Sequence, residues 1–187
     1  MAQYEVTFAG FGGQGVMVAG QLLAYSGIAE GKNALWLPSY GPEMRGGTAY
    51  CTVVISDKRI SSPIINNPQA VCIFNPPSYE KFMPHVKPGG VAIVNSSLIT
   101  LVTDRTDITE IRITANALAM KSGNVKAINI AMLGALIGAS GVVGQDTVKK
   151  VLTEKLGKKK SVLDINMRVF EQGFKLAGEA MRKGNRL

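Results

Sequence analysis

Apolar and polar positions divide the first part of the chain into one strand and one helix. Tyr4–Ala9 is a run of β-branched and aromatic residues, which predicts a strand, and the spacing over Val16–Glu30 predicts a helix. Two positions on one face of that helix, Gly20 and Gly27, are glycines, so this face can approach a sheet closely. Gly31 is placed to end the helix as its C′ residue.

Further short apolar runs predict a sheet with several more strands. A short helix over Tyr79–Met83 is expected to end at Pro84. Strands that alternate with helices over short connections favour a mostly parallel sheet covered on both faces. The remaining predicted strands are Ala34–Leu37, Thr48–Ile55, Val71–Phe74, Val91–Asn95 and Ile111–Thr114, with a short return at Lys58–Ile60.

The last 70 or so residues are predicted to be mostly helical. Helices are expected over Ala127–Ala139 and Val148–Leu156, and Ser161 with Asp164 has the spacing of a capping box at the start of a final helix. That helix carries an apolar stripe typical of a core or interface face: Leu163, Met167, Phe170, Phe174, Ala177 and Met181. The chain, residues 1–187, is therefore predicted to be a single three-layer Rossmann-like α/β domain with a helical C-terminal portion.

A glycine-rich turn follows the first strand and opens the first helix. Gly10-x-Gly12-x-x-Gly15, with Gly13 and Gln14 between, has the context of a dinucleotide-binding turn, in which backbone N–H groups approach a phosphate. A dinucleotide-binding turn also needs an acidic residue at the end of the second strand to bind ribose. Here the second strand ends at Leu37-Pro38-Ser39, which has no carboxylate, and Glu30 lies in the last turn of the helix. An NAD-dependent enzyme is therefore disfavoured, and phosphate binding and close helix–strand packing both remain open.

A second candidate element is the loop Pro38–Gly47, which follows the second strand. Arg45 could bind a carboxylate or phosphate through two parallel hydrogen bonds, or Glu43 could hold it as an internal clasp. We expect this loop and the glycine turn to lie at the same edge of the sheet. The candidate ligand or interface residues of the loop are Tyr40, Gly41, Glu43, Met44, Arg45 and Gly46.

Charge and cysteine content narrow the functional classes. The net charge of +8, from 21 Lys and Arg against 13 Asp and Glu, favours acidic partners. No aromatic residue interleaves the Lys158–Lys160 run, so this run is interpreted as a solvated surface and nucleic acid is not expected as a partner. Cys51 and Cys72 are too few for a disulfide framework or a four-ligand metal site and are predicted to be buried thiols, and His85 a surface turn residue.

The N-terminus lacks the basic region of a signal peptide, and the longest apolar stretch, Ala127–Val143, is short and interrupted by small residues. We therefore expect a cytoplasmic protein without a membrane span.

Two blocks in order give the chain a specific resemblance. Gly10-Phe11-Gly12-Gly13-Gln14-Gly15-Val16, then Glu30-Gly31-Lys32, and Pro38-Ser39-Tyr40-Gly41-Pro42-Glu43-Met44-Arg45-Gly46-Gly47-Thr48 resemble the gamma subunit of 2-oxoacid:ferredoxin oxidoreductases. Ser61-Ser62-Pro63-Ile64 continues the match, which is strongest over residues 4–64. The Glu43-Met44 form of the loop looks closer to the 2-oxoglutarate and branched-chain relatives than to the pyruvate ones.

The resemblance implies an accessory subunit of a larger enzyme, with no catalytic residue of its own. Partner subunits of the family, alpha and beta, bind thiamine diphosphate and Mg²⁺, and a ferredoxin-like delta subunit carries [4Fe-4S] clusters. Such enzymes decarboxylate a 2-oxoacid, pass electrons to ferredoxin and transfer the acyl group to coenzyme A. The gamma chain would shape the coenzyme A or substrate entrance, and when isolated it could dimerise with itself. The alternatives are a branched-chain, pyruvate or indolepyruvate enzyme, or a free-standing nucleotide-binding module.

Overall fold

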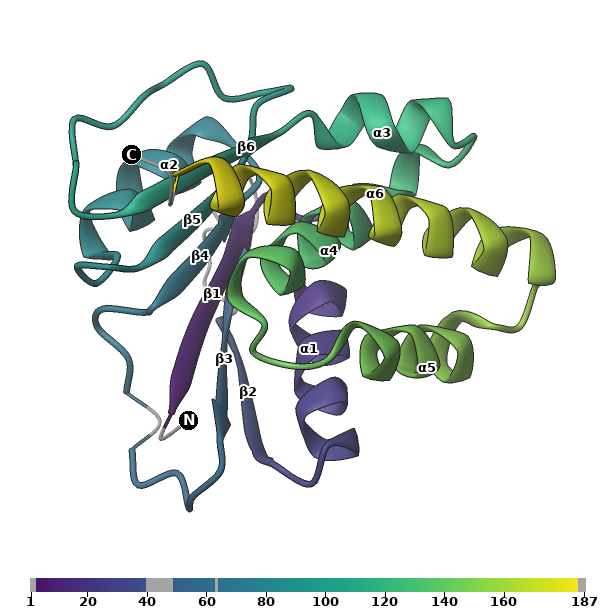
Figure 1. Cartoon of the computed structure of the whole chain (residues 1–187), viewed down its shortest axis with the longest axis horizontal. Coiled ribbons are helices and arrows are strands. Elements are labelled where there is room, and N and C mark those ends of the chain that lie inside the picture. Colours follow the sequence, from purple (N-terminus) through teal and green to yellow (C-terminus); the bar gives the residue numbers. More distant parts are fainter. Residues whose placement is uncertain (1–2, 40–48, 63, 185–187) are drawn as a thin grey trace.

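The computed structural model describes residues 3–39, 49–62 and 64–184 as a six-stranded sheet with helices on both faces (Figure 1). The strands are β1 (Tyr4–Gly10), β2 (Asn33–Ser39), β3 (Ala49–Ser56), β4 (Ala70–Ile73), β5 (Val91–Asn95) and β6 (Thr109–Ile113). The helices are α1 (Val16–Ala29), α2 (Pro76–Phe82), α3 (Ala115–Lys121), α4 (Ile128–Ser140), α5 (Gln145–Leu156) and α6 (Lys160–Gly184), with 3₁₀ turns η2 (Met83–His85) and η3 (Val125–Ala127).

The strand order is β2-β3-β1-β4-β5-β6. β1, β4, β5 and β6 pair in parallel, and β3 is antiparallel to both of its neighbours, β1 and β2. Five of the six described strands therefore point the same way, which confirms the predicted α/β domain with a mostly parallel sheet.

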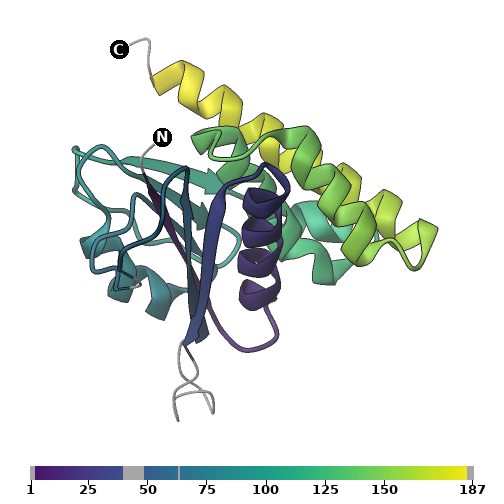
Figure 2. The same cartoon turned by 90° about the horizontal axis from the view of Figure 1, so that it is seen from below.

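Side chains alternate between two cores because successive residues of a strand point to opposite faces. Cys72 of β4 faces the larger core, under α1, α4 and α6, whereas Val71 and Ile73 face a smaller core under α2. Figure 2 shows the sheet nearly edge-on, with α2 on one side and the other helices on the opposite side. The sheet thus separates two cores of unequal size.

Glycines let α1 lie directly on the sheet, as predicted. A Cβ atom on Gly20 would come within 2.5 Å of Cys51 Sγ, and one on Gly27 within 2.5 Å of Ile55 Cδ1. Gly31 ends the helix in the left-handed region at φ +74°, with its N–H donating to Ile28 O and the next N–H to Gly27 O, the Schellman pattern.

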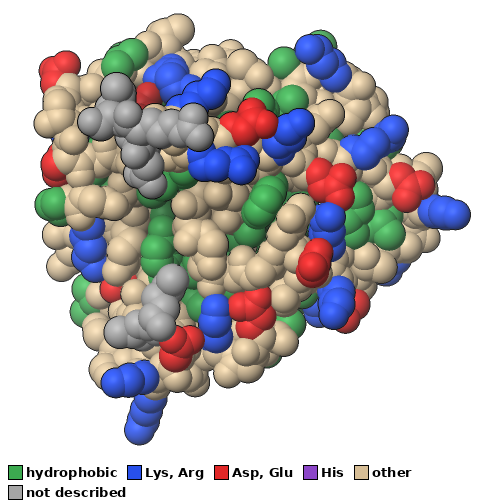
Figure 3. Space-filling view, in the orientation of Figure 1, with side chains coloured by type: hydrophobic (Ala, Val, Ile, Leu, Met, Phe, Trp, Pro, Cys, Tyr) green, Lys and Arg blue, Asp and Glu red, His purple; other side chains and the backbone are tan. Residues whose placement is uncertain are grey.

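The predicted stripe of the last helix packs α6 against α4. Phe170 is fully buried, and Met167, Phe174 and Met181 pack against the larger core. On the outer side of α5 and α6, side chains of both charge signs alternate (Figure 3), and Lys149 of α5 pairs with Glu171 of α6 at 2.6 Å.

The structure corrects three local expectations and adds one helix. Lys58–Ile60 forms no strand, and α3 was not predicted. α6 begins at Lys160, so Ser161 lies in its first turn and not at the N-cap. The helix after β4 begins at Pro76, ahead of the predicted Tyr79, because the Asn75 side chain accepts a hydrogen bond from Ser78 N–H and caps it.

Candidate functional site

The glycine turn joins the carboxyl end of β1 to the start of α1. Gly13 and Gly15 have φ of +88° and +78°, a left-handed conformation that only glycine adopts without strain. Gly12 is exposed, and a Cβ atom there would have open space within 4 Å. The turn is therefore built by its glycines, with its outer surface open to solvent.

Gln14 folds back into the turn. Its Oε1 accepts a hydrogen bond from Phe11 N–H at 2.7 Å and a longer one from Asn75 Nδ2 at 3.4 Å. Gly10 must be glycine because a Cβ atom there would lie 2.6 Å from this Oε1 and 2.8 Å from Phe74 Cβ. The predicted residues Gly10, Gly12, Gly13, Gln14 and Gly15 are thus brought together, with Gln14 serving the shape of the turn.

Buried amides continue this edge across the parallel strands. Asn75 follows β4 and Asn95 ends β5, and their exposed fractions are 1% and 0%. Asn95 Nδ2 donates to Asn116 Oδ1 at 2.9 Å, at the start of α3 beyond β6. A row of uncharged hydrogen-bonding groups therefore lines the carboxyl ends of β4, β5 and β6.

Asn129 of α4 supports the turn from the helical side. Its Nδ2 donates to Gly15 O at 3.2 Å, and a Cβ atom on Gly15 would come within 2.6 Å of the same nitrogen. Sequence reasoning missed all four asparagines. A usable signal for two of them was a polar residue directly after a buried apolar run, as in Phe74-Asn75 and Val94-Asn95.

Glu30 does not belong to this edge. It pairs with Lys32 at 2.9 Å and accepts a hydrogen bond from Gly144 N–H, while Lys32 Nζ donates to Val142 O at 2.8 Å. Partial burial acts to raise the pKa of Glu30, but these hydrogen bonds outweigh it and leave the pKa below its ordinary value. Its role is to connect the end of α1 to the start of α5.

The six loop candidates, Tyr40, Gly41, Glu43, Met44, Arg45 and Gly46, lie outside the described residues. The strands that flank them are placed. Ser39 pairs with Tyr50, and Ala49 pairs with Gly10 of β1. Ala49 therefore lies beside Gly10 at the start of the glycine turn, and Ser39 lies on the far side of β3 from it.

The cysteines are buried thiols, as predicted, and burial raises the pKa of Cys51 to about 12. His85 is exposed in η2. Within residues 3–39, 49–62 and 64–184, no group of three or more His, Cys, Asp or Glu side chains is arranged to hold a metal ion.

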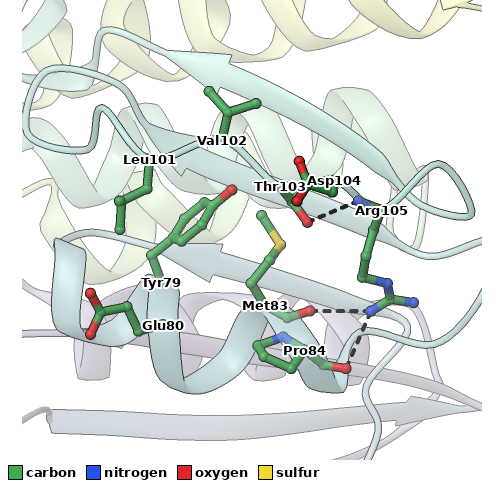
Figure 4. Close-up of a pocket in the computed structure, with 9 residues that line it drawn as sticks. All are labelled: Tyr79, Glu80, Met83, Pro84, Leu101, Val102, Thr103, Asp104 and Arg105. Atoms are coloured by element: carbon green, nitrogen blue, oxygen red, sulfur yellow. Dashed lines mark hydrogen bonds between the residues drawn. The ribbon is translucent and has the colours of Figure 1, made fainter.

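A hollow lies on the α2 side of the sheet, between α2 and the segment 101–105 (Figure 4). Its volume is about 560 Å³, and Tyr79, Met83 and Leu101 form an apolar wall. The Tyr79 hydroxyl donates to Glu110 at 2.8 Å. The Arg105 guanidinium donates hydrogen bonds to Asp107 and to the carbonyl oxygens of residues 83, 84 and 86, so it holds the segment 101–105 against the end of α2 and η2.

The fold and the site define an α/β domain with a mostly parallel sheet and a glycine-rich turn at the carboxyl end of its first strand. The chain belongs to the pyruvate ferredoxin/flavodoxin oxidoreductase family, whose sequence profile matches residues 5–176.

Curated relatives fall into two length classes. The chain is 35% identical over 173 residues to the ketoisovalerate oxidoreductase subunit VorA of Methanothermobacter marburgensis, covering 91% of this chain and 36% of VorA. It is 32% identical over 180 residues to the 2-oxoglutarate synthase subunit KorC of Methanocaldococcus jannaschii, covering 94% of each. The chain thus spans a little over a third of VorA but nearly all of KorC.

Solved structures share the fold. A keto/oxoacid ferredoxin oxidoreductase gamma subunit from Geobacter sulfurreducens superposes with a TM-score of 0.81 at 30% identity, covering 93% of this chain and 98% of that one. The 2-oxoglutarate:ferredoxin oxidoreductase of Magnetococcus marinus gives a TM-score of 0.86 at 24% identity, covering 96% of this chain and 32% of that one. Among the described residues, no helix is both long and apolar enough to cross a membrane.

Proposed function

We propose that the chain is the gamma subunit of a cytoplasmic, coenzyme-A-dependent 2-oxoacid:ferredoxin oxidoreductase with 2-oxoglutarate as its substrate. The observation that carries the proposal is the end-to-end agreement with a gamma subunit, 93% of this chain and 98% of the Geobacter one. The KorC match, over 94% of each chain, supports 2-oxoglutarate.

In this proposal the chain positions other subunits and does no chemistry of its own. Thiamine diphosphate, Mg²⁺ and [4Fe-4S] clusters belong to the alpha, beta and ferredoxin-like delta subunits, which decarboxylate the 2-oxoacid and pass electrons to ferredoxin. The described residues contribute an uncharged amide edge and a glycine turn. The edge and segment 40–48 would border the entrance for coenzyme A or substrate.

A branched-chain 2-oxoacid is the second candidate substrate. The identity to the ketoisovalerate subunit VorA, 35%, is slightly above the 32% to KorC. The two readings agree on the role of the chain and differ only in the acid that the assembled enzyme accepts.

Purification from the native host tests the proposal. The tagged chain is pulled down from anaerobically grown cells, and the eluate is assayed for viologen reduction with coenzyme A and single 2-oxoacids. We expect thiamine-binding subunits in the eluate and reduction that is fastest with 2-oxoglutarate. Fastest reduction with 2-oxoisovalerate would assign the branched-chain substrate, and a chain that elutes alone and inactive would contradict the subunit role.

A further inference from the structure

A cavity of about 470 Å³ opens where α4 and α6 begin, on the face of the sheet that α1, α4 and α6 cover. Its volume is within the usual range of binding pockets. Most of its wall is apolar, and the apolar lining residues are Val18, Ile130, Leu156, Val162 and Ile165. Leu156 ends α5 and Val162 lies in the first turn of α6, and the connection between these two helices lies at the end of the molecule farthest from the sheet (Figure 2).

Two buried amides line the same cavity. Asn166 of α6 is only 5% exposed, and its side chain makes no hydrogen bond to any other described residue. Asn129 is 6% exposed, and its Nδ2 is used by Gly15 O while its Oδ1 accepts from no described donor. Both residues line the cavity, and their unpaired amide atoms are not among the fully buried side-chain atoms without a partner in the described part of the chain, so they can hydrogen-bond a group that enters the cavity. Together they offer donors and an acceptor, the complement of a peptide group.

Lys126 lies at the rim of the cavity, and the segments that supply most of the lining carry further lysines. Segments 120–130 and 156–166 supply most of the lining and contain five lysines against a single acidic residue, Asp164. Lys126 and the run Lys158–Lys160 are exposed and form no ion pair with the described residues. Carboxylates are therefore the complementary groups at this rim.

Apolar side chains surround the opening. Val18 is 40% exposed, Val162 36%, and Val125, between two lining residues, 63%. Exposed apolar groups that cluster around a cavity, inside a polar rim, mark interaction surfaces.

We propose that this cavity binds an acidic segment of a partner polypeptide. One apolar side chain of the segment enters the cavity, its neighbouring peptide group hydrogen-bonds to Asn129 and Asn166, and flanking carboxylates face the lysines. The inference deepens the proposed function, since a subunit of a complex needs such surfaces, but its test uses the isolated chain and does not depend on the pull-down.

The test is a titration of the ¹⁵N-labelled full chain, followed by NMR, with the peptide acetyl-Glu-Leu-Glu-amide. We expect saturable shifts of the side-chain NH₂ signals of Asn129 and Asn166. Two control peptides should each bind at least tenfold more weakly: acetyl-Lys-Leu-Lys-amide, which has the opposite charge, and acetyl-Glu-Gly-Glu-amide, which lacks the apolar side chain. A tenfold loss of affinity corresponds to about 1.4 kcal/mol of binding free energy.

Variants separate binding from folding. Asn166→Leu keeps the volume and removes only an amide without a partner, so its melting temperature should equal or exceed that of the wild type, while peptide binding weakens about tenfold. Lys126→Ala should also weaken binding. Lys175→Ala removes an exposed lysine farther along α6 and should leave binding unchanged.

Several results would overturn the proposal. They include the absence of shifts at millimolar peptide, equal binding of the basic peptide, and unchanged affinity in Asn166→Leu. N-acetylleucine binding as tightly as the peptide would assign the cavity to a small amphiphilic anion. Shifts of the same signals that follow protein concentration without peptide would assign it to a second copy of the chain.

Discussion

At the scale of single residues, the glycine turn contains the positions that tolerate substitution least. Gly10 has no room for a Cβ atom beside Gln14 and Phe74, and Gly15 combines a left-handed backbone with close contact to Asn129. Gly12, two residues from Gly10 in the same turn, has neither restriction. Substitution by alanine should therefore destabilise the protein at Gly10 and Gly15 and have little effect on stability at Gly12.

Gly15→Ala should lower the free energy of unfolding by about 1–3 kcal/mol, because alanine is strained at φ +78° and its Cβ would crowd Asn129 Nδ2. Gly12→Ala is the matched control and should change it by less than about 0.5 kcal/mol. Urea denaturation of both variants measures the difference. Similar losses in the two would contradict this account of the turn.

For Arg45 the expectation from the sequence stays a prediction, since residue 45 lies outside the described residues. If Arg45 faces ligand, Arg45→Ala should reduce turnover of the assembled enzyme while the subunits still assemble. Gel filtration and dye reduction on the same preparation measure both properties. Failed assembly would favour the clasp with Glu43.

The site was predictable where a backbone rule applied, and not where side chains meet across the fold. Positive φ and close packing demand glycine, so Gly10, Gly13 and Gly15 could be recognised in the sequence. Asn95 hydrogen-bonds to Asn116, which is 21 positions along the chain, and Asn129 to Gly15, which is 114 positions away. A single sequence does not reveal such pairings.

At the scale of elements, α4 and α6 meet through glycines in an unusually close contact. A Cβ atom on Gly134 would lie 2.2 Å from Phe170 O, and one on Gly138 would lie 2.2 Å from Phe174 O. On the opposing helix, a Cβ atom on Gly173 would lie 2.1 Å from Ala131 O. The glycines that interrupt the apolar stretch in the sequence are therefore what brings the two backbones together.

Gly134→Ala should destabilise the fold by about 1–3 kcal/mol or more, because the clash is with backbone and the helices must separate. A Cβ atom on Gly178, on the α6 side of the same contact, would meet only Gly138 O, at an ordinary 3.6 Å, so Gly178→Ala is the control. It should be neutral or stabilise by up to about 1 kcal/mol through helix propensity. Thermal unfolding distinguishes the two, and a stabilising Gly134→Ala would contradict the close contact.

The Glu30 link between α1 and α5 predicts a pH dependence. Burial opposes ionisation, but hydrogen bonds from Lys32 and Gly144 lower the pKa of Glu30 below its ordinary 4.5. A carboxyl with a lowered pKa stabilises the fold above pH 4.5, and the contribution is lost as pH falls through the folded-state value. Glu30→Gln should therefore be less stable than wild type at pH 7, with the difference shrinking below pH 4.5.

Urea titrations at several pH values measure this difference. Glu154→Gln, at an exposed position of α5, is the control and should follow the wild type throughout. A Glu30→Gln deficit that persists unchanged in acid would show that shape, and not charge, matters at this position.

At the scale of the whole molecule, the α/β class, the single mostly parallel sheet and most elements were predictable from apolar periodicity. The antiparallel direction of β3 was not, because an apolar run indicates a strand without its direction, and the pairing of β3 with β1 and β2 appears only in the fold. The helix α3 was missed because Ala115–Lys121 is a single short element without a strong apolar period.

The packing of helices on the sheet predicts that the two cysteine thiols are unreactive in the native protein. Cys51 and Cys72 are fully buried, and burial raises the pKa of both thiols, to about 12 for Cys51. Neither should react with a thiol reagent in the native protein near neutral pH, and both should react at once in urea. Rapid labelling of the native chain would contradict the described core.

The central claim, that the chain is a required subunit of a 2-oxoacid oxidoreductase, is tested most directly by reconstitution. The partner subunits are purified without this chain, and coenzyme-A-dependent viologen reduction by 2-oxoglutarate is measured before and after the chain is added. We expect little activity without the chain and restoration of activity when the chain is added in stoichiometric amount. Full activity of the partner subunits alone, unchanged by the added chain, would contradict it.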